Sequence, residues 1–298
     1  MESTEPVNET IGPTTSDART RWLAGAPVTD GRVTAAGVST AVLEGGAGPP
    51  IVLLHGQGGF GGMFLPMLED LVETNHVVVP DLPGLGASTV AEGAVNGERV
   101  MRWLDELIDQ TCTTPPVIVG HSLGGSIAAR YAASRERRLS RLVLADAGGL
   151  AGRVRPASGV LVALIRFSIR PTPRKADRFS RRLLFDHERT FQRMGPGRRN
   201  LFQTYMIELA RTPSVKRTNR ALLRELGFPA IPAEELERIQ VPTTLIWGRH
   251  DPVMPLAGAQ EASRRYGWPL HVIDKAGHVP AMEQPAAFLA ALRRAMTA

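Results

Sequence analysis

Cysteine and long apolar runs are scarce in this chain, and each shortage excludes a class of protein. Cys112 is the one cysteine among 298 residues, which excludes an intramolecular disulfide and gives no metal-type spacing of thiols. The longest apolar run, residues 160–165 with Phe167 just beyond, is far shorter than the ~20 residues that span a bilayer. We therefore expect a cytoplasmic protein with no metal site and no transmembrane anchor.

The beginning of the chain also lacks the features of a secretory signal. Residues 1–20 are polar, open with acidic rather than basic residues, and contain no apolar stretch. We predict a mobile N-terminal tail over residues 1–22.

Acidic residues are few in the middle of the chain. Residues 151–240 hold 19 Lys and Arg against 8 Asp and Glu, whereas the whole chain has a net charge of +6, so the remainder is net acidic. Such a basic block can attract nucleic acid, anionic lipid or an acidic substrate, or it can simply be a solvated surface. Because interleaved aromatics and nucleic-acid motifs are missing, we expect no nucleic-acid partner, and peripheral membrane contact stays open.

Short apolar runs rich in branched residues alternate with stretches compatible with helices, which favours a parallel sheet covered on both faces. The predicted parallel strands are residues 51–54, 77–79, 117–119, 142–144 and 244–247, with a hairpin before them at 32–36 and 38–43 and a final strand at 269–273. The predicted helices are residues 63–73, 98–111, 122–133, 256–266 and 284–296.

The alternation stops in the middle of the chain and then resumes. We predict an α/β core formed by residues 23–149 and 241–298, interrupted by a helical insertion over residues 150–240. The insertion follows a strand whose carboxyl end lies at the sheet edge where open α/β folds bind ligands. We expect the insertion to be a cap over that edge.

The sharpest motif places a serine between a strand and a helix. Gly120-His121-Ser122-Leu123-Gly124 directly follows a predicted strand and opens a predicted helix. Glycines on both sides of Ser122 permit a tight turn that raises the hydroxyl above the sheet, and the helix N-terminus offers free N–H donors to an oxyanion. We predict that Ser122 is a nucleophile.

A serine nucleophile needs a base, and the base needs a carboxylate to orient it. His278 lies in a loop after the last predicted strand, and Asp251 directly follows the strand at 244–247. The chain order Ser122, Asp251, His278 is the order of nucleophile, acid and base in hydrolases of this kind. His250 is the competing base, and Asp146, which also ends a strand, is the alternative acid.

A second glycine-rich loop follows the strand at 51–54 and predicts the remaining part of an oxyanion site. In His55-Gly56-Gln57-Gly58-Gly59 the glycines allow the backbone to approach a reacting carbonyl. We predict the backbone N–H groups of Gln57 and Leu123 as the two donors. The loop lacks the spacing of a nucleotide-binding motif, which leaves a flexible turn as the alternative.

Together these motifs, with Pro80-Asp81-Leu82-Pro83-Gly84-Leu85-Gly86-Ala87-Ser88 and Gly248-Arg249-His250-Asp251-Pro252, resemble those of the α/β-hydrolase superfamily from about residue 32 onward, outside the insertion. The resemblance implies an α/β-hydrolase fold with a mostly parallel eight-stranded sheet, helices on both faces, an inserted helical cap and no cofactor. It also implies a structural role for Asp81.

Within that superfamily a serine nucleophile favours hydrolysis of carboxylic esters through an acyl-enzyme on Ser122. Carbon-carbon bond hydrolysis of a vinylogous diketone is the alternative, although such relatives often carry Met after the serine where this chain has Leu123. Acyltransferase or haloperoxidase-like activity and a non-catalytic ligand-binding protein rank lower. We expect a small-molecule substrate with an apolar body, and because the cap is basic we expect the site to tolerate an anionic group on that substrate. The sequence leaves the oligomeric state open.

Overall fold

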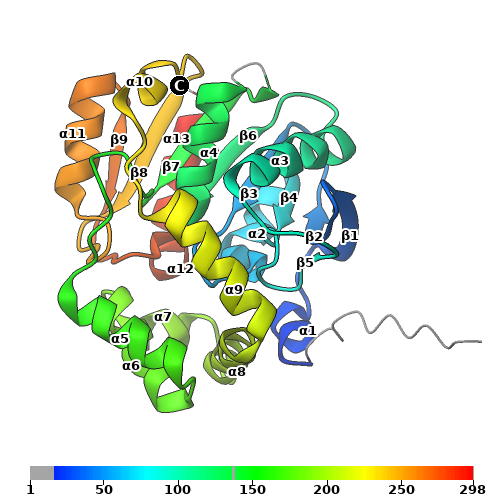
Figure 1. Ribbon diagram of the computed structural model, residues 1–298, viewed down its shortest axis with the longest axis vertical. Helices are drawn as coiled ribbons and strands as arrows, with labels where there is room; N and C mark the ends of the chain where they lie inside the picture. The colour runs from blue at the N-terminus through cyan, green and yellow to red at the C-terminus, as the bar shows by residue number, and fades with distance from the viewer. Residues whose placement is uncertain (1–16, 136–137, 298) are drawn as a thin grey trace, which may run out of the picture.

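The computed structural model describes residues 17–135 and 138–297, and a single sheet runs through the centre of the chain (Figure 1). Its main path has the strand order β1-β2-β4-β3-β6-β7-β8-β9, with the short strand β5 paired to β2. The strands are β1 (Thr29–Ala35), β2 (Val38–Gly45), β3 (Pro50–Leu54), β4 (His76–Pro80), β5 (Thr89–Val90), β6 (Val117–His121), β7 (Arg141–Ala145), β8 (Thr243–Gly248) and β9 (Leu270–Ile273).

Strand β3 pairs in parallel with β4 and β6, and β6, β7, β8 and β9 continue the parallel pairing in that order. Strand β2 pairs antiparallel with β1, β4 and β5. The prediction of a mostly parallel sheet with an antiparallel lead-in hairpin is confirmed. Strand β5 was not predicted, because two residues are too few to give an alternating apolar pattern. It makes the sheet nine-stranded rather than eight-stranded.

Two apolar cores lie on opposite faces of the sheet, because neighbouring strand residues point to opposite sides. Ile51 and Leu53 of β3 face one core, whereas Val52 and Leu54 face the other. The core of Val52 and Leu54 is covered by α3 (Gly97–Thr111), α4 (Leu123–Ser134) and α11 (Leu256–Tyr266). The core of Ile51 and Leu53 is covered by η1 (Gly61–Phe64), α2 (Leu65–Val72), α12 (Pro280–Glu283) and α13 (Pro285–Thr297).

The insertion predicted over residues 150–240 is helical. Its elements are α5 (Ser158–Ile169), α6 (Pro173–Leu183), α7 (His187–Arg193), α8 (Arg198–Arg211), α9 (Pro213–Leu222), the π-helical turn η3 (Leu223–Gly227) and α10 (Ala233–Glu237). Helices α5 to α8 lie together at the lower end of the molecule in Figure 1, and α9 runs from them back toward the sheet. We call α5 to α9 the cap.

Helix α10 departs from the predicted cap boundary, because it lies against the core. It contacts α4, and Arg130 of α4 forms an ion pair with Glu235 of α10 at 3.7 Å. Leu236 is buried in the same core as α4. The cap therefore ends before α10.

The tail predicted over residues 1–22 extends too far. Residues 1–16 lie outside the described residues, but α1 (Asp17–Leu23) is a helix in contact with α8. Trp22 is fully buried, and its Nε1 donates a hydrogen bond to the Gly62 carbonyl at 2.9 Å. Its ring also packs against Phe60 and Phe202, so a single aromatic residue fixes this part of the polar N-terminal segment.

Candidate active site

Ser122 forms the sharp turn between β6 and α4. Its backbone has φ +54° and ψ −113°, a region that residues with a side chain rarely adopt. The turn is held from both sides, because the Ser122 N–H donates to the Ala145 carbonyl and the Ser122 carbonyl accepts from Ser126 and Gly148. The strain is therefore supported by the neighbouring strand β7 and by the first turn of α4.

The two glycines of the motif are required by close backbone packing. A Cβ at Gly120 would lie 2.5 Å from the Gly124 carbonyl oxygen, and one at Gly124 would lie 2.4 Å from the Leu54 carbonyl oxygen. Neither neighbour is a flexible side chain, so any larger residue would push α4 away from the sheet. The position of the Ser122 hydroxyl therefore depends on both glycines.

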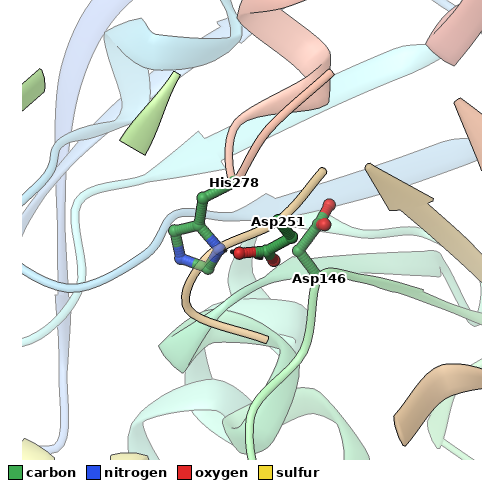
Figure 2. Close-up of side chains that lie close together, drawn as sticks. All are labelled: Asp146, Asp251 and His278. Atoms are coloured by element: carbon green, nitrogen blue, oxygen red, sulfur yellow. Dashed lines mark hydrogen bonds and ion pairs between the residues drawn. The ribbon is translucent and has the colours of Figure 1, made fainter. Parts of the chain in front are cut away.

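His278 lies in the loop between β9 and α12, and its ring is within hydrogen-bond distance of two groups. Its Nε2 lies 3.0 Å from the Ser122 Oγ. Its Nδ1 lies 2.8 Å from Asp251 Oδ2, and Figure 2 shows the imidazole facing this carboxylate. All three residues are buried. Side chains that are 27 and 156 residues apart from His278 in the sequence thus form one hydrogen-bonded chain.

Asp251 is held in its ionised form by its surroundings. Its Oδ1 accepts hydrogen bonds from the backbone N–H groups of Val253 at 2.7 Å and Met254 at 3.0 Å. Burial alone would raise the pKa of Asp251, but the His278 imidazole and the backbone donors hold this pKa below its usual range. A carboxylate is therefore available to orient the imidazole through Nδ1.

Asp146, the alternative acid, lies beside Asp251 in Figure 2 but has another partner. Its Oδ1 accepts from the Gly248 N–H at 2.9 Å, and its backbone has φ +44°. Complete burial and the charge of Asp251 raise the pKa of Asp146 well above its usual range, which favours the neutral form of this carboxyl.

These two carboxyl groups and His278 bring three potential ligand atoms within 4.8 Å of one another, the spacing of a metal site. However, the Nδ1 of His278 and the carboxylate of Asp251 are already bonded to each other. Burial raises the pKa of the third group, Asp146, which favours its protonated form, a weaker ligand than a carboxylate. The arrangement fits a hydrogen-bonded chain better than a metal centre.

The backbone N–H groups predicted as oxyanion donors lie beside the serine. Gln57 and Leu123 both line the same cavity as Ser122 and His278. Among the described residues, neither N–H group donates a hydrogen bond to another protein group. The Leu123 N–H is free because it opens α4, where the first turn has no partner within the helix.

The glycine-rich loop approaches the serine closely. A Cβ at Gly56 would lie 2.8 Å from His121 Nδ1 and 3.1 Å from the Ser122 Cβ. Behind the loop, Asp81 accepts from the Gly61 N–H at 2.5 Å and the Ala87 N–H at 2.7 Å. Asp81 therefore braces this loop from outside the site.

Two residues outside the predicted catalytic set hold the loop of His278, namely Glu283, which the sequence did not single out, and His121 of the serine motif. Glu283 is buried, and its carboxylate accepts from the backbone N–H groups of Gly277 at 2.9 Å, Val279 at 3.1 Å and Phe185 at 2.6 Å. Glu283 comes soon after His278 and before the final helix, which is the one available sequence signal. Its side chain connects the loop of His278 to Phe185, which lies in the cap between α6 and α7.

His121 is the second of these residues. Its Nε2 donates to the His278 carbonyl at 2.7 Å, and burial together with the nearby His278 ring lowers the pKa of His121 to about 3. The ring is therefore neutral. His250, the competing base, is exposed and stacks on Phe185 with ring centroids 4.5 Å apart, outside the hydrogen-bonded chain.

A cavity of about 220 Å³ lies between the cap and Ser122. Its walls are largely apolar and include Val160, Leu164, Phe179, Phe202, Met206 and Val215. Gln203 and Asn219 also line the cavity, and the Nε2 of Gln203 and the Oδ1 of Asn219 have no hydrogen-bond partner among the described residues. The cavity thus offers an apolar environment with a few polar groups, the usual composition of a small-molecule site.

Comparison with known proteins gives one family. A family model described as "Alpha/beta hydrolase family" matches residues 51–292. The pimeloyl-[acyl-carrier protein] methyl ester esterase of Aeromonas salmonicida is 27% identical over 266 residues, covering 86% of this chain and 98% of the relative.

Two solved structures are similar in fold. The 2-hydroxy-6-oxo-6-phenylhexa-2,4-dienoate hydrolase of Rhodococcus sp. strain RHA1 has a TM-score of 0.79 and 23% identity, covering 91% of this chain and 99% of that one. Carboxylesterase CesB of Bacillus subtilis has a TM-score of 0.77 and 20% identity, covering 93% and 94%. At these identities the similarity is one of fold.

Proposed function

The chain belongs to the alpha/beta hydrolase family, and on that basis we propose that it hydrolyses carboxylic esters through an acyl-enzyme on Ser122. The observation that carries this proposal is the hydrogen-bonded chain from Ser122 through His278 to Asp251 at one side of an apolar cavity. Such a chain supplies what an unactivated hydroxyl lacks, namely a base within reach of its proton.

In the first half of the proposed reaction, the Ser122 Oγ attacks the ester carbonyl while His278 Nε2 takes its proton. Asp251 stabilises the resulting imidazolium through Nδ1. The negative oxygen of the tetrahedral intermediate accepts from the N–H groups of Gln57 and Leu123. The imidazolium then protonates the leaving alcohol, and the acyl group stays on Ser122.

In the second half, a water molecule replaces the alcohol. His278 takes a proton from this water as its oxygen attacks the acyl carbon, and the same two N–H groups hold the second oxyanion. Collapse of this intermediate returns the proton to Ser122 and releases the carboxylic acid. Every proton is accounted for by Ser122 and His278, so the chain's own residues suffice.

The substrate that we propose is a small molecule with an apolar acyl or ring portion, since apolar side chains of the cap form most of the cavity wall. Gln203 and Asn219 would bind a polar substituent on that portion, because their unpartnered side-chain atoms lie at the cavity. The Aeromonas salmonicida relative, named as a methyl ester esterase, supports the choice of an ester.

A fluorophosphonate probe and a series of p-nitrophenyl esters of graded chain length test this proposal. We expect the wild-type chain to be labelled and to hydrolyse the esters, whereas Ser122→Ala should lose labelling and roughly 10⁶-fold in kcat. Ser134→Ala, which removes an exposed hydroxyl from the same helix, is the matched control and should behave as wild type.

The same experiment separates ester hydrolysis from carbon-carbon hydrolysis. A dienone of the meta-cleavage type is offered beside the esters, with Ser122→Ala again as the control. Faster turnover of the dienone than of every ester would replace the proposed activity with the alternative. Labelling that survives in Ser122→Ala would overturn Ser122 as the nucleophile.

A further inference from the structure

The exposed large apolar side chains of this protein gather on one helix. Among the described residues, five large hydrophobic residues are exposed, and four of them belong to α5: Leu161 at 39%, Val162 at 46%, Ile165 at 48% and Ile169 at 75%. Contiguous apolar patches are uncommon on soluble monomers and mark contact with a partner or a membrane. The helix lies at the lower end of the molecule in Figure 1.

Helix α5 has a buried face toward the protein. Its buried residues Val160, Ala163 and Phe167 follow the i, i+3, i+7 spacing of one helix face. These side chains already satisfy the packing of α5 against its neighbours. Val162, Ile165 and Ile169 on its other side therefore pack in neither the core nor the cavity wall.

The exposed side of α5 consists of two parallel rows. Leu161, Ile165 and Ile169 are spaced by four residues and form an apolar row. Arg166 is exposed beside this row, and Arg170, also exposed, directly follows Ile169 at the end of the helix, so the two arginines form a second, basic row. We call these five residues the α5 surface. An exposed helix face that combines isoleucines with arginines is the pattern of helices that lie in the interface of a bilayer.

Basic residues predominate in the sequence around the α5 surface. Residues 151–182 hold nine Lys and Arg but one acidic residue, Asp177, which is paired with Arg181 and Arg199. Neither Arg166 nor Arg170 has an acidic partner among the described residues. The surroundings of the apolar row thus complement an anionic surface, whereas a neutral or basic partner would leave these cations unpaired.

We propose that the α5 surface docks on an anionic lipid bilayer, with the apolar row entering the headgroup region and the arginines contacting lipid phosphates. Each arginine near an anionic leaflet is expected to strengthen binding about fivefold. The isoleucines add the burial of their side chains, which makes binding depend on both rows. This docking is peripheral, since no described helix is long and apolar enough to cross a membrane.

The docked orientation brings the cavity to the bilayer. Leu161 belongs to the exposed row and also lines the cavity, as do its neighbours Val160 and Leu164. One helix thus forms both the proposed membrane contact and a wall of the pocket. Resting on the ester hydrolysis proposed above, this arrangement would let an apolar ester pass from lipid to Ser122 without crossing bulk water.

Vesicle sedimentation tests the docking independently of catalysis. The full chain is mixed with vesicles of phosphatidylcholine alone or with one third phosphatidylglycerol, at low and at high salt. We expect binding to the anionic vesicles that weakens with salt, and little binding to phosphatidylcholine. The double variant Ile165→Ser with Ile169→Ser should lose roughly tenfold or more in affinity. Arg166→Gln with Arg170→Gln should lose roughly 25-fold.

The matched control is Arg264→Gln with Arg294→Gln, which removes two exposed arginines from helices of the core. It should bind vesicles as wild type does. None of the six substituted residues lines the cavity, so all three double variants should hydrolyse a soluble short ester at the wild-type rate.

Three results would overturn the proposal. The first is no binding of the wild type to anionic vesicles, and the second is equal loss in the control variant. The third is a dimer in analytical ultracentrifugation that the Ile165→Ser, Ile169→Ser variant abolishes while vesicles stay unbound, because the α5 surface would then contact a second copy of the chain. Absence of ester hydrolysis with intact vesicle binding would refute the proposed function alone.

Discussion

Replacing Asp251 and Asp146 separately by Asn discriminates between the two carboxyl groups next to His278. In Asp251→Asn, the amide oxygen keeps the two backbone N–H groups of Val253 and Met254 as donors. The amide nitrogen then faces the Nδ1 of His278. Because an amide nitrogen only donates, Nδ1 must be unprotonated, and the ring proton moves to Nε2.

A proton on Nε2 prevents the imidazole from accepting the proton of the Ser122 hydroxyl, 3.0 Å away. We expect a loss of about 10⁴-fold in kcat, the size of effect that the wrong tautomer produces in serine hydrolases. This corresponds to about 5.5 kcal/mol of transition-state stabilisation. By contrast, burial raises the pKa of Asp146 and favours its neutral form, and Asn reproduces its carbonyl toward Gly248. We expect Asp146→Asn to stay close to wild type.

The assay is steady-state hydrolysis of a p-nitrophenyl ester at pH 7, with thermal unfolding of each variant as a control for folding. Equal losses in Asp251→Asn and Asp146→Asn, with both proteins folded, would refute this assignment of the acid. Full activity of Asp251→Asn would refute it as well, since the tautomer argument leaves no route for the Ser122 proton.

Three further substitutions test parts of the structure that support the site. Gly56→Ala places a Cβ 2.8 Å from His121 Nδ1, and the resulting displacement of the loop should lower kcat roughly 10²-fold. The circular dichroism spectrum should stay unchanged, and unaltered kinetics would contradict this reasoning. Trp22→Ala should lower the free energy of unfolding by about 3–5 kcal/mol in urea titrations, because this fully buried ring anchors α1. A stability equal to wild type would mean that α1 is dispensable. Glu283→Leu leaves the N–H groups of Gly277, Val279 and Phe185 without this acceptor, and the first two are buried and should cost about 1–3 kcal/mol each. Glu283→Gln should be milder, and equal urea midpoints for the two variants would argue against this.

The parts of the fold that could be predicted are those whose sequence pattern spans only a few consecutive residues. The strand before Ser122 is a short run of branched apolar residues, and the helix after it begins with glycines. The turn between them can therefore be predicted from consecutive residues. Asp251 and His278 each follow a strand, and parallel strands bring their carboxyl ends to one edge. Local signals therefore indicated which residues meet, even across long stretches of sequence.

The parts that could not be predicted depend on partners far away in the chain. Trp22 is a lone aromatic in a polar segment, and its burial depends on Phe202 of the cap. In the sequence, Glu283 has the position of a solvated carboxylate near a helix end. Its burial follows from its hydrogen bonds to the loop of His278, which no local pattern predicts. Helix α10 reads as part of the insertion because only its contact with α4 assigns it to the core.

The attachment of the His278 loop to the cap has a mechanical consequence. The backbone N–H of His278 donates to the Leu183 carbonyl at the end of α6, and Glu283 accepts from Phe185 just beyond. Any outward swing of α6 must break these bonds or drag the imidazole away from Ser122. An opening that keeps both the bonds and the imidazole in place must hinge elsewhere in the cap, so substrate entry on the α6 side costs either these bonds or the alignment of His278 with Ser122.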